Sequence, residues 1–428
     1  MENAMVAAYN PKKLADARSI RMLFFISWVT YVSTYVGRLN FSASMGEMII
    51  AGNFTKSELG LVGAVFFFAY GIGQFISGIL GDKVAPKQLV FIGVSTSSIL
   101  NLAMGVSSSY EAMIVLWSLN GLMQSLTWSP IARLISDRLP RKECFKAFVN
   151  LSTTVPAGTL LTYFMCSMLI EYSNWRMVFI LAAILMFPVA VIWYVVISKL
   201  EYKAESDGFA EEDDFQSAVG RNTLVHKTSF HTVFLASGLL MISIGAMLHG
   251  ILKDGIMTWL PTYLAEGFNT SSSLAIRLTM VLPIINLAGV YISNYFNRKI
   301  FMNELVTAAF LFVVTVLALL MLIIYGQDNL LISLIMLGIV TSAMLGVNSM
   351  LVSLVPLYFS ESRRVSTISG MLNSTTYLGS AISSYGVGAI AQQFGWGITR
   401  SSWCIMATVG AVICMISSNK WRNFTKQS

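Results

Sequence analysis

Runs of about 20 predominantly apolar residues recur along the whole chain, and this repetition restricts the possible folds more than any other feature. A run of this length crosses the hydrocarbon core of a bilayer as one α-helix. Only 11% of the 428 residues are charged, whereas a soluble protein carries roughly 25%. The chain is therefore predicted to be an all-α membrane protein. Twelve segments are expected, beginning near Met22, Ser57, Gln88, Tyr110, Cys144, Trp175, Phe230, Ser271, Phe301, Leu330, Val365 and Ser401.

The lysines and arginines of the predicted loops are concentrated on one side of the membrane. That side includes both termini, whereas the opposite loops hold only Lys56, Arg176, Arg277 and Arg400. Because basic residues accumulate in cytoplasmic loops, both termini are expected in the cytoplasm. A bacterial cytoplasmic membrane is the expected location. The net charge of +7 then reflects membrane topology, and no nucleic-acid partner is expected.

One polar, acid-rich interval divides the twelve segments into two sets of six. Residues 199–229 lack apolar periodicity and are expected to form a flexible cytoplasmic linker. The expected units are an N-terminal half over residues 1–198 and a C-terminal half over residues 230–428. A docking role is the alternative to a solvated linker. The chain is expected to be a monomer.

The two halves carry a weak internal repeat. A constant shift of 215 places residues 55–59 on residues 270–274, each at the expected start of the second helix of its half. The same shift places Arg38 on Lys253. Parallel repeats in transporters face each other across an axis along the membrane normal, so these two cations are expected to converge near the midplane.

A cation within a membrane helix is unfavourable by roughly 2.5–3.5 kcal/mol on insertion scales, so Arg38 and Lys253 require an explanation. Asp254 is expected to point away from the stripe of Lys253, because adjacent helical residues lie about 100° apart. Glu47 lies toward the outer end of its helix. We therefore expect a water-filled cavity that holds an anionic substrate between the cations. Neutralisation of each cation by a neighbouring helix is the alternative, and Asp254 and Glu47 are candidates for proton coupling.

Three further polar residues share the helix faces of the two cations. Tyr31 and Tyr35 precede Arg38 by seven and three residues and are candidate donors to the same anion. Tyrosines that line an interhelical seam are the alternative. His249 lies four residues before Lys253. It is a candidate donor to substrate, a candidate acceptor of a coupling proton, or a histidine of the helix-packing core.

The sequence indicates no metal centre, cofactor site or enzyme. The four cysteines, Cys144, Cys166, Cys404 and Cys414, show neither CxxC spacing nor histidine partners and are expected to be free thiols. The sequence also lacks a phosphate-cradling glycine-rich loop and a Ser/His/Asp grouping. No catalytic residue and no cofactor are therefore expected.

The stretch from Gly78 to Lys87, GILGDKVAPK, resembles the signature between helices 2 and 3 of the major facilitator superfamily. It keeps the leading glycine, the aspartate and the flanking cations, and has Ala85 in place of a second glycine. The resemblance implies two six-helix halves related by a pseudo-two-fold axis. It also implies that Asp82, Lys83 and Lys87 latch the halves during conformational change and do not contact substrate.

Further stretches are similar to the organophosphate:phosphate antiporters of that superfamily, which include glycerol-3-phosphate, hexose-6-phosphate and glucose-6-phosphate transporters. They are YVGRLNF (35–41), AYG (69–71), NGLMQSLTWSP (120–130), WLPTYL (259–264) and YLG (377–379). The resemblance implies that Arg38 and Lys253 clamp the substrate phosphoryl group. It adds Gln74, Trp128 and Tyr377 as candidate substrate-binding residues. The implied ligands are a phosphorylated metabolite and inorganic phosphate.

Three positions depart from the glycerol-phosphate members of that family. Leu39, Gln74 and Val155 stand where those members have further basic residues or a histidine. The site is thus less positive, which leaves a singly charged or carboxylate substrate open. Three functions are open: exchange of a phosphorylated metabolite for phosphate, proton-coupled symport of a carboxylate such as a sugar acid, and a sugar-phosphate sensor that binds without flux.

Overall fold

The computed structural model describes residues 11–151, 153–209, 237–327, 329–359 and 365–427. These residues are helical apart from short connections and one backbone bridge between Lys13 and Phe209. The N-terminal half contains α1 (Ala17–Gly52), α2 (Lys56–Lys83), α3 (Pro86–Val106), α4 (Tyr110–Ser125), α5 (Trp128–Arg138), α6 (Arg141–Leu151), α7 (Thr154–Tyr172) and α8 (Trp175–Asp207). The C-terminal half contains α11 (Leu239–Gly267), α12 (Ser272–Thr279), α13 (Leu282–Phe296), η1 (Asn297–Phe301), α14 (Glu304–Tyr325), α15 (Leu330–Asn348), η2 (Ser349–Leu354), η3 (Val355–Phe359) and α16 (Val365–Gln427).

The described helices group into twelve membrane-length segments, six in each half, as predicted. Four segments are broken: α4 continues into α5, α6 into α7, α12 into α13 and η1, and α15 into η2 and η3. α16 contains two segments, because Gly395 interrupts it with a φ of 75°, which glycine adopts without strain. Within the described ranges, eight stretches have the length and hydropathy of a membrane span. α1 falls below that hydropathy because it carries Arg38, Asn40 and many hydroxyl side chains.

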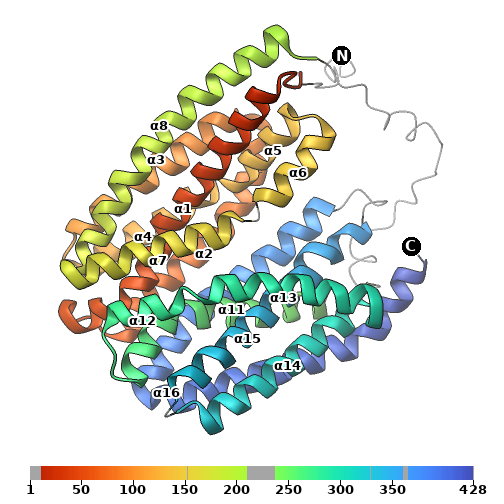
Figure 1. The fold of residues 1–428 in the computed structure, drawn as a ribbon. Helices are drawn as coiled ribbons and strands as arrows, with labels where there is room; N and C mark the ends of the chain where they lie inside the picture. The colour runs from red at the N-terminus through yellow and green to blue at the C-terminus, as the bar shows by residue number, and fades with distance from the viewer. Residues whose placement is uncertain (1–10, 152, 210–236, 328, 360–364, 428) are drawn as a thin grey trace.

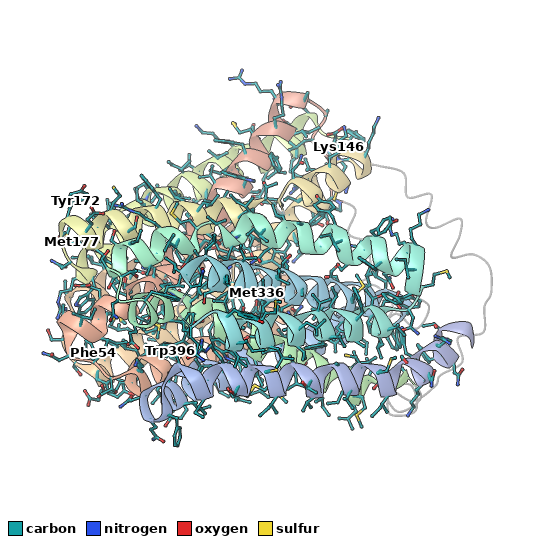
Figure 2. All side chains as sticks on the ribbon, turned by 60° about the horizontal axis from the view of Figure 1, so that its bottom comes forward. Phe54, Lys146, Tyr172, Met177, Met336 and Trp396 are labelled. Carbon is teal, nitrogen blue, oxygen red and sulfur yellow. The ribbon has the colours of Figure 1, made fainter. Side chains whose placement is uncertain are left out.

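The two sets of helices form two bundles that lie against each other (Figure 1). α2 packs on α16, α1 on α11 and α7 on α12. The bundles diverge toward the end at which α1 begins and α16 ends; this end is called the terminal face. The opposite end, where the bundles meet, is called the sealed face. Phe54 and Trp396 lie toward the sealed face and Lys146 toward the terminal face (Figure 2).

α8 extends beyond the predicted end of the N-terminal half. Residues 199–207 were expected in the flexible linker because they are polar, but they form the last turns of α8. Three ion pairs hold this extension. Lys87 lies 2.7 Å from Glu201, Arg138 lies 2.8 Å from Glu205, and Lys203 lies 2.9 Å from Asp16, the N-cap of α1. The hydrogen bond from Lys203, with those from Ser19, holds the pKa of Asp16 well below its usual range. The predicted linker residues from 210 onward and the predicted start at Phe230 lie outside the described residues.

The helix ends place the register of the internal repeat one residue from the predicted shift. Asn53 and Asn269, which follow α1 and α11, both adopt left-handed φ values, 57° and 51°. They are 216 residues apart, and the residues that cap α2 and α12 show the same separation. In this register Arg38 corresponds to Asp254 and not to Lys253, which is the residue before Asp254.

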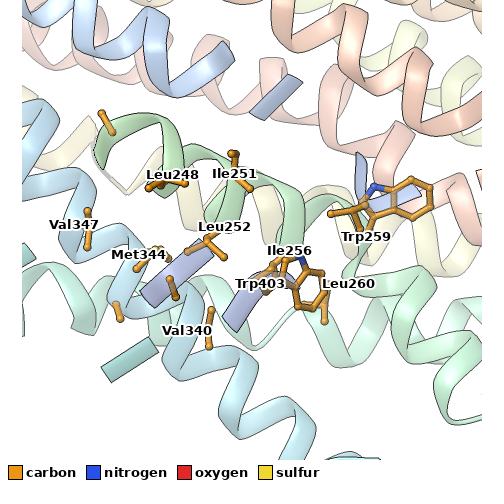
Figure 3. Packing of buried hydrophobic residues seen from close by; sticks show 14 of the residues in the cluster. Leu248, Ile251, Leu252, Ile256, Trp259, Leu260, Val340, Met344, Val347 and Trp403 are labelled. Carbon is orange, nitrogen blue, oxygen red and sulfur yellow. The ribbon is translucent and has the colours of Figure 1, made fainter. Parts of the chain in front are cut away.

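The C-terminal bundle is packed around α11. Its side chains Leu252 and Ile256 meet Val340 and Met344 of α15 and Trp403 of α16 (Figure 3). Large apolar side chains also cover the outside of both bundles (Figure 2), where they are exposed to the surroundings of the molecule. An exposed apolar surface of this extent matches contact with lipid tails.

Two glycines bring α11 and α16 into backbone contact. A Cβ added at Gly250 would collide with the carbonyl oxygen of Thr376, and one at Gly379 would collide with the carbonyl oxygen of Met247. Small residues at such positions let membrane helices approach closely. The contact fixes the height of α11 against α16 immediately beside the predicted site.

Candidate functional site: a charged cavity between the halves

A cavity of about 550 Å³ lies between the two bundles. Its walls come from α1, α2, α4 and α7 of the N-terminal half and from α11, α13, α15 and α16 of the C-terminal half. Cavities that bind small ligands span about 300–1,000 Å³. Among the described residues, the charged members of the wall are Arg38, Lys253 and Asp254. The two predicted cations therefore line one cavity.

Arg38 rests against tyrosine rings. Its guanidinium carbon lies 4.0 Å from the ring centroid of Tyr35 and 5.9 Å from that of Tyr70. Tyr377 of α16 meets Tyr70 edge-on with centroids 4.8 Å apart, and Tyr31 meets Tyr35 edge-on at 5.6 Å. All four tyrosines line the cavity. Cation–π attraction holds the guanidinium plane, and Arg38 has no ion pair with a described carboxylate.

Buried carboxamides fix α1 on both sides of Arg38. Asn101 of α3 and Asn120 of α4 donate to the backbone carbonyl of Gly37 at 3.1 and 2.9 Å. Asn40 donates to Asn101 at 2.8 Å. Hydrogen bonds in a buried network are strong because no water competes for the partners. Arg38 is thus presented to the cavity by a rigid segment of α1.

A second layer supports the tyrosines. A Cβ added at Gly158 of α7 would lie 2.7 Å from both Cβ and Cγ of Tyr35, so only glycine fits there. Trp128, a predicted binding residue, does not line the cavity. It packs on Tyr31 with ring centroids 4.8 Å apart. Trp128 begins α5 and supports the cavity-lining Tyr31 without lining the cavity itself.

Lys253 and Asp254 both face the cavity, and this corrects the expectation that Asp254 points away. Nζ of Lys253 lies 3.3 Å from Oδ1 of Asp254. The hydroxyl of Ser380 on α16 donates to Oδ2 of Asp254 at 2.5 Å. The angular argument failed because the wide cavity admits both positions and the long lysine stem reaches across to its neighbour. Lys253 is therefore partly neutralised by its own helix.

His249 does not line the cavity. Its side chain is fully buried, and neither ring nitrogen has a hydrogen-bond partner among the described residues. In this conformation His249 lies in the helix-packing core, which is one of its three predicted places. The reason is the close packing of α11 on α16 at the adjacent Gly250, which leaves no open space one turn before Lys253.

The remaining predicted residues whose side chains the structure describes lie outside the cavity wall. Glu47 and Gln74 are half-buried and lie outside the cavity wall. Lys87 pairs with Glu201 within the N-terminal half, so no latch to the other half is formed there. The side chains of Asp82 and Lys83 lie outside the described part of the structure.

Leu39 and Val155, two of the three positions at which basic residues are missing, do line the cavity. The lower positive charge expected from the sequence is therefore a property of this cavity itself. The third position, Gln74, does not contribute to its wall.

The C-terminal wall carries polar residues that sequence reasoning missed. Asn286 and Asn294 of α13 and Thr341 and Asn348 of α15 line the cavity. The hydroxyl of Thr341 lies 2.7 Å from the side-chain oxygen of Asn286. A search for charges overlooks such residues. Carboxamides spaced along one face of an otherwise apolar helix are the signal that identifies them.

The cavity is closed at the sealed face. Two ion pairs join the halves among the described residues, and both lie at this face: Lys56 with Glu266 at 2.7 Å, and Arg277 with Glu171. The bundles diverge toward the terminal face (Figure 1). This is the geometry of a carrier whose central site faces one side of the membrane.

A model of the Major Facilitator Superfamily matches residues 23–384. The chain belongs to the major facilitator superfamily. It is accordingly a membrane transporter and not an enzyme. A bacterial homologue of the human lysosomal transporter Spinster, in an inward-facing and occupied conformation, shares the fold with a TM-score of 0.72. The two chains are 14% identical, and the match covers 97% of this chain and 98% of that one.

Several curated relatives match most of the chain. A probable hexose phosphate transport protein of Chlamydia trachomatis is 24% identical over 400 residues, which cover 87% of this chain and 85% of that protein. The glycerol-3-phosphate transporter of Bacillus subtilis is 23% identical over 419 residues, 92% of each chain. The likeness to organophosphate transporters seen in the sequence motifs is therefore confirmed over nearly the whole chain.

Proposed function

We propose that this transporter exchanges a phosphorylated metabolite for inorganic phosphate. The observation that carries the proposal is a cavity between the halves that contains Arg38 from one half and Lys253 from the other. The relatives named for hexose phosphate and glycerol-3-phosphate transport support the substrate class.

Arg38 is the principal phosphoryl-binding group in this proposal. Its planar fork of donors matches two phosphate oxygens at once and stays charged at every physiological pH. Tyr31, Tyr35 and Tyr377 line the same cavity, and in this proposal their hydroxyls donate to the remaining oxygens. Lys253 adds a mobile point charge from the other half.

Exchange follows from the division of the cations between the halves. An anion that contacts both Arg38 and Lys253 draws the halves together across the cavity. It thereby favours the change between the inward-open and outward-open conformations. In the empty carrier no anion bridges the two cations. The empty carrier therefore changes more slowly between its inward-open and outward-open conformations. Each inward step with one anion is then followed by an outward step with another.

The proposed orientation places the terminal face in the cytoplasm of a bacterial cell. It is supported by the concentration of lysines and arginines in the loops and termini of that side. The sealed face is then the periplasmic side, and the structure represents an inward-facing carrier.

Counterflow in proteoliposomes tests the proposal. Vesicles loaded with phosphate are expected to take up labelled phosphate and glucose 6-phosphate. Arg38→Ala and Lys253→Ala should lower uptake by about tenfold or more, because a lost charge-assisted hydrogen bond costs about 1.5–3 kcal/mol. Lys146→Ala, at an exposed lysine of the terminal face, is the matched control. Absence of uptake by the unmodified protein would contradict the proposal.

The same vesicles separate the other candidate functions. Proton-coupled carboxylate symport is favoured by one observation, the carboxylate of Asp254 in the cavity wall. It predicts uptake of a sugar acid driven by a pH gradient into vesicles without internal anion. A sensor predicts saturable phosphate-ester binding with no flux under either condition.

A further inference from the structure

The cavity contains a built-in counter-ion. Asp254 touches Lys253 at 3.3 Å and is held by the Ser380 hydroxyl at 2.5 Å. Its side chain is 17% exposed and that of Lys253 is 23% exposed, so the pair is partly shielded from water. Such a pair is screened much less than one at the surface.

We propose that Asp254 is a specificity-determining residue that limits the cavity to anions with a single negative charge. The inference rests on the proposed function and names the ionic form that the site accepts. Two cations and one carboxylate leave one net positive charge among the described lining residues. A phosphate monoester is then bound as its monoanion.

The physical basis is the position of Asp254 next to the cation that the substrate must reach. A ligand anion that approaches Lys253 also approaches Asp254, because the two side chains are in contact. A second charge on the ligand gains from Lys253 but is repelled by the carboxylate at similar distance, and like charges in a shielded site are strongly unfavourable. The second charge must also lose part of its hydration in this shielded site, so the dianion binds more weakly than the monoanion.

Ser380 gives the carboxylate a fixed place. Its hydroxyl also lies 3.0 Å from the carbonyl oxygen of Thr376. The backbone of α16 therefore fixes the hydroxyl that binds Asp254. The glycine contact between α11 and α16 keeps this distance short. The other titratable or charged groups among the described lining residues are Lys253, Arg38, Tyr31, Tyr35, Tyr70, Tyr291 and Tyr377, and His249 is buried on α11 outside the wall.

Two isosteric ligands test the inference. Glucose 6-phosphate changes from one charge to two as its second proton leaves near pH 6, about the value for phosphate monoesters, whereas glucose 6-sulfate keeps one charge. Binding of each to the purified full-length protein is measured by calorimetry at about pH 5.5 and about pH 7.5, on either side of that transition. The unmodified protein should bind glucose 6-phosphate more weakly at the higher pH and glucose 6-sulfate equally at both.

Asp254→Asn should raise the affinity for glucose 6-phosphate at the higher pH about 10- to 100-fold relative to glucose 6-sulfate, the effect of removing one close like charge. Asp207→Asn makes the same chemical change at an exposed site on α8 and should leave the ratio unchanged. Ser380→Ala removes the hydrogen bond but keeps the charge. It should also preserve the ratio, whereas a merely structural role of Asp254 predicts that Ser380→Ala and Asp254→Asn act alike.

The outcomes distinguish the two proposals. If the unmodified protein binds both esters and Asp254→Asn leaves their affinity ratio unchanged, the charge-selectivity inference is wrong and the proposed function stands. If glucose 6-sulfate shows the same pH dependence as glucose 6-phosphate, the protein titrates and not the ligand, which also overturns it. If neither ester nor phosphate binds, both proposals fail.

Discussion

The guanidinium of Arg38 owes its position to a cavity-lining tyrosine and to a glycine behind it that does not line the cavity. The ring of Tyr35 lies against the guanidinium of Arg38. The backbone of α7 at Gly158 packs so closely on the other side of Tyr35 that a Cβ there would collide with it. Gly158→Ala should push Tyr35 toward Arg38 and weaken phosphate binding by about tenfold, the scale of 1–3 kcal/mol that overpacking costs. Calorimetry with phosphate measures the change.

Gly386→Ala is the matched control for this prediction. A Cβ at Gly386 meets nothing within 4 Å, so the substitution should leave phosphate binding unchanged. Equal affinity of Gly158→Ala and the unmodified protein would show that the tyrosine position does not control the arginine.

The charged residues of the cavity were predictable from sequence to different degrees. Arg38 stood out because a charge in an apolar segment needs a partner or a cavity. Asp254 was misplaced, and the choice among the three roles of His249 stayed open, because a helix wheel gives direction but not the depth of the neighbouring helices. Asp254 reaches a wide cavity, while His249 lies where α11 and α16 are in close contact. Only the packing distance decides between these cases.

At the scale of helices, the pair α11 and α16 acts as one unit of the site. Gly379→Ala should force these helices apart, lengthen the bond from Ser380 to Asp254, and destabilise the protein by about 1–3 kcal/mol. The thermal unfolding temperature in detergent should fall, and phosphate affinity should change with it.

Gly370→Ala on the same helix is the comparison, because a Cβ there meets nothing within 4 Å. Its unfolding temperature should equal or exceed that of the unmodified protein, since alanine favours helix. A Gly379→Ala variant as stable as Gly370→Ala would mean that the contact is not tight.

The twelve segments could be predicted because the bilayer fixes their length, but their ends and breaks could not. The extension of α8 through residue 207 is polar, and polarity alone does not distinguish a solvated helix from a flexible linker. Its ion pairs with Asp16 and Lys87 stabilise the helix, and they are visible only in the structure. The repeat was found one residue out of register for a similar reason. Weak identity leaves the shift undetermined until Asn53 and Asn269 mark the helix ends.

Across the whole molecule, the sealed face must open for transport, and its ion pairs are suited to that. The side chains of Lys56 and Glu266 are 18% and 32% exposed, and those of Arg277 and Glu171 are 40% and 37% exposed. An ion pair as accessible as Arg277–Glu171 contributes only about 0–1 kcal/mol, and the Lys56–Glu266 pair is more shielded. Two of the four basic residues expected on this side of the membrane, Lys56 and Arg277, thus form the ion pairs between the halves among the described residues, and the pair of Arg277 breaks at little cost.

The backbones of α2 and α16 also approach each other closely between the halves. A disulfide engineered at this contact would prevent the halves from separating. A Cβ placed at Gly63 would lie 3.6 Å from Cβ of Ser384 on the other half, within the range of about 3.5–4.5 Å that a disulfide spans. A Gly63→Cys, Ser384→Cys double variant is therefore expected to form a disulfide on oxidation. Counterflow should stop in the oxidised protein, because the halves can no longer separate at the sealed face.

Reduction of the same vesicles should restore whatever counterflow the double variant had before oxidation, so each sample is its own control for the effect of the substitutions. The single variants should not respond to the oxidant, which excludes the four native free cysteines. Phosphate binding from the terminal face should persist in the locked protein, because the disulfide leaves the divergent end of the cavity unchanged. Full counterflow through a quantitatively cross-linked protein would show that transport does not require separation of α2 from α16, and the alternation of the two halves about the Arg38–Lys253 cavity would have to be abandoned.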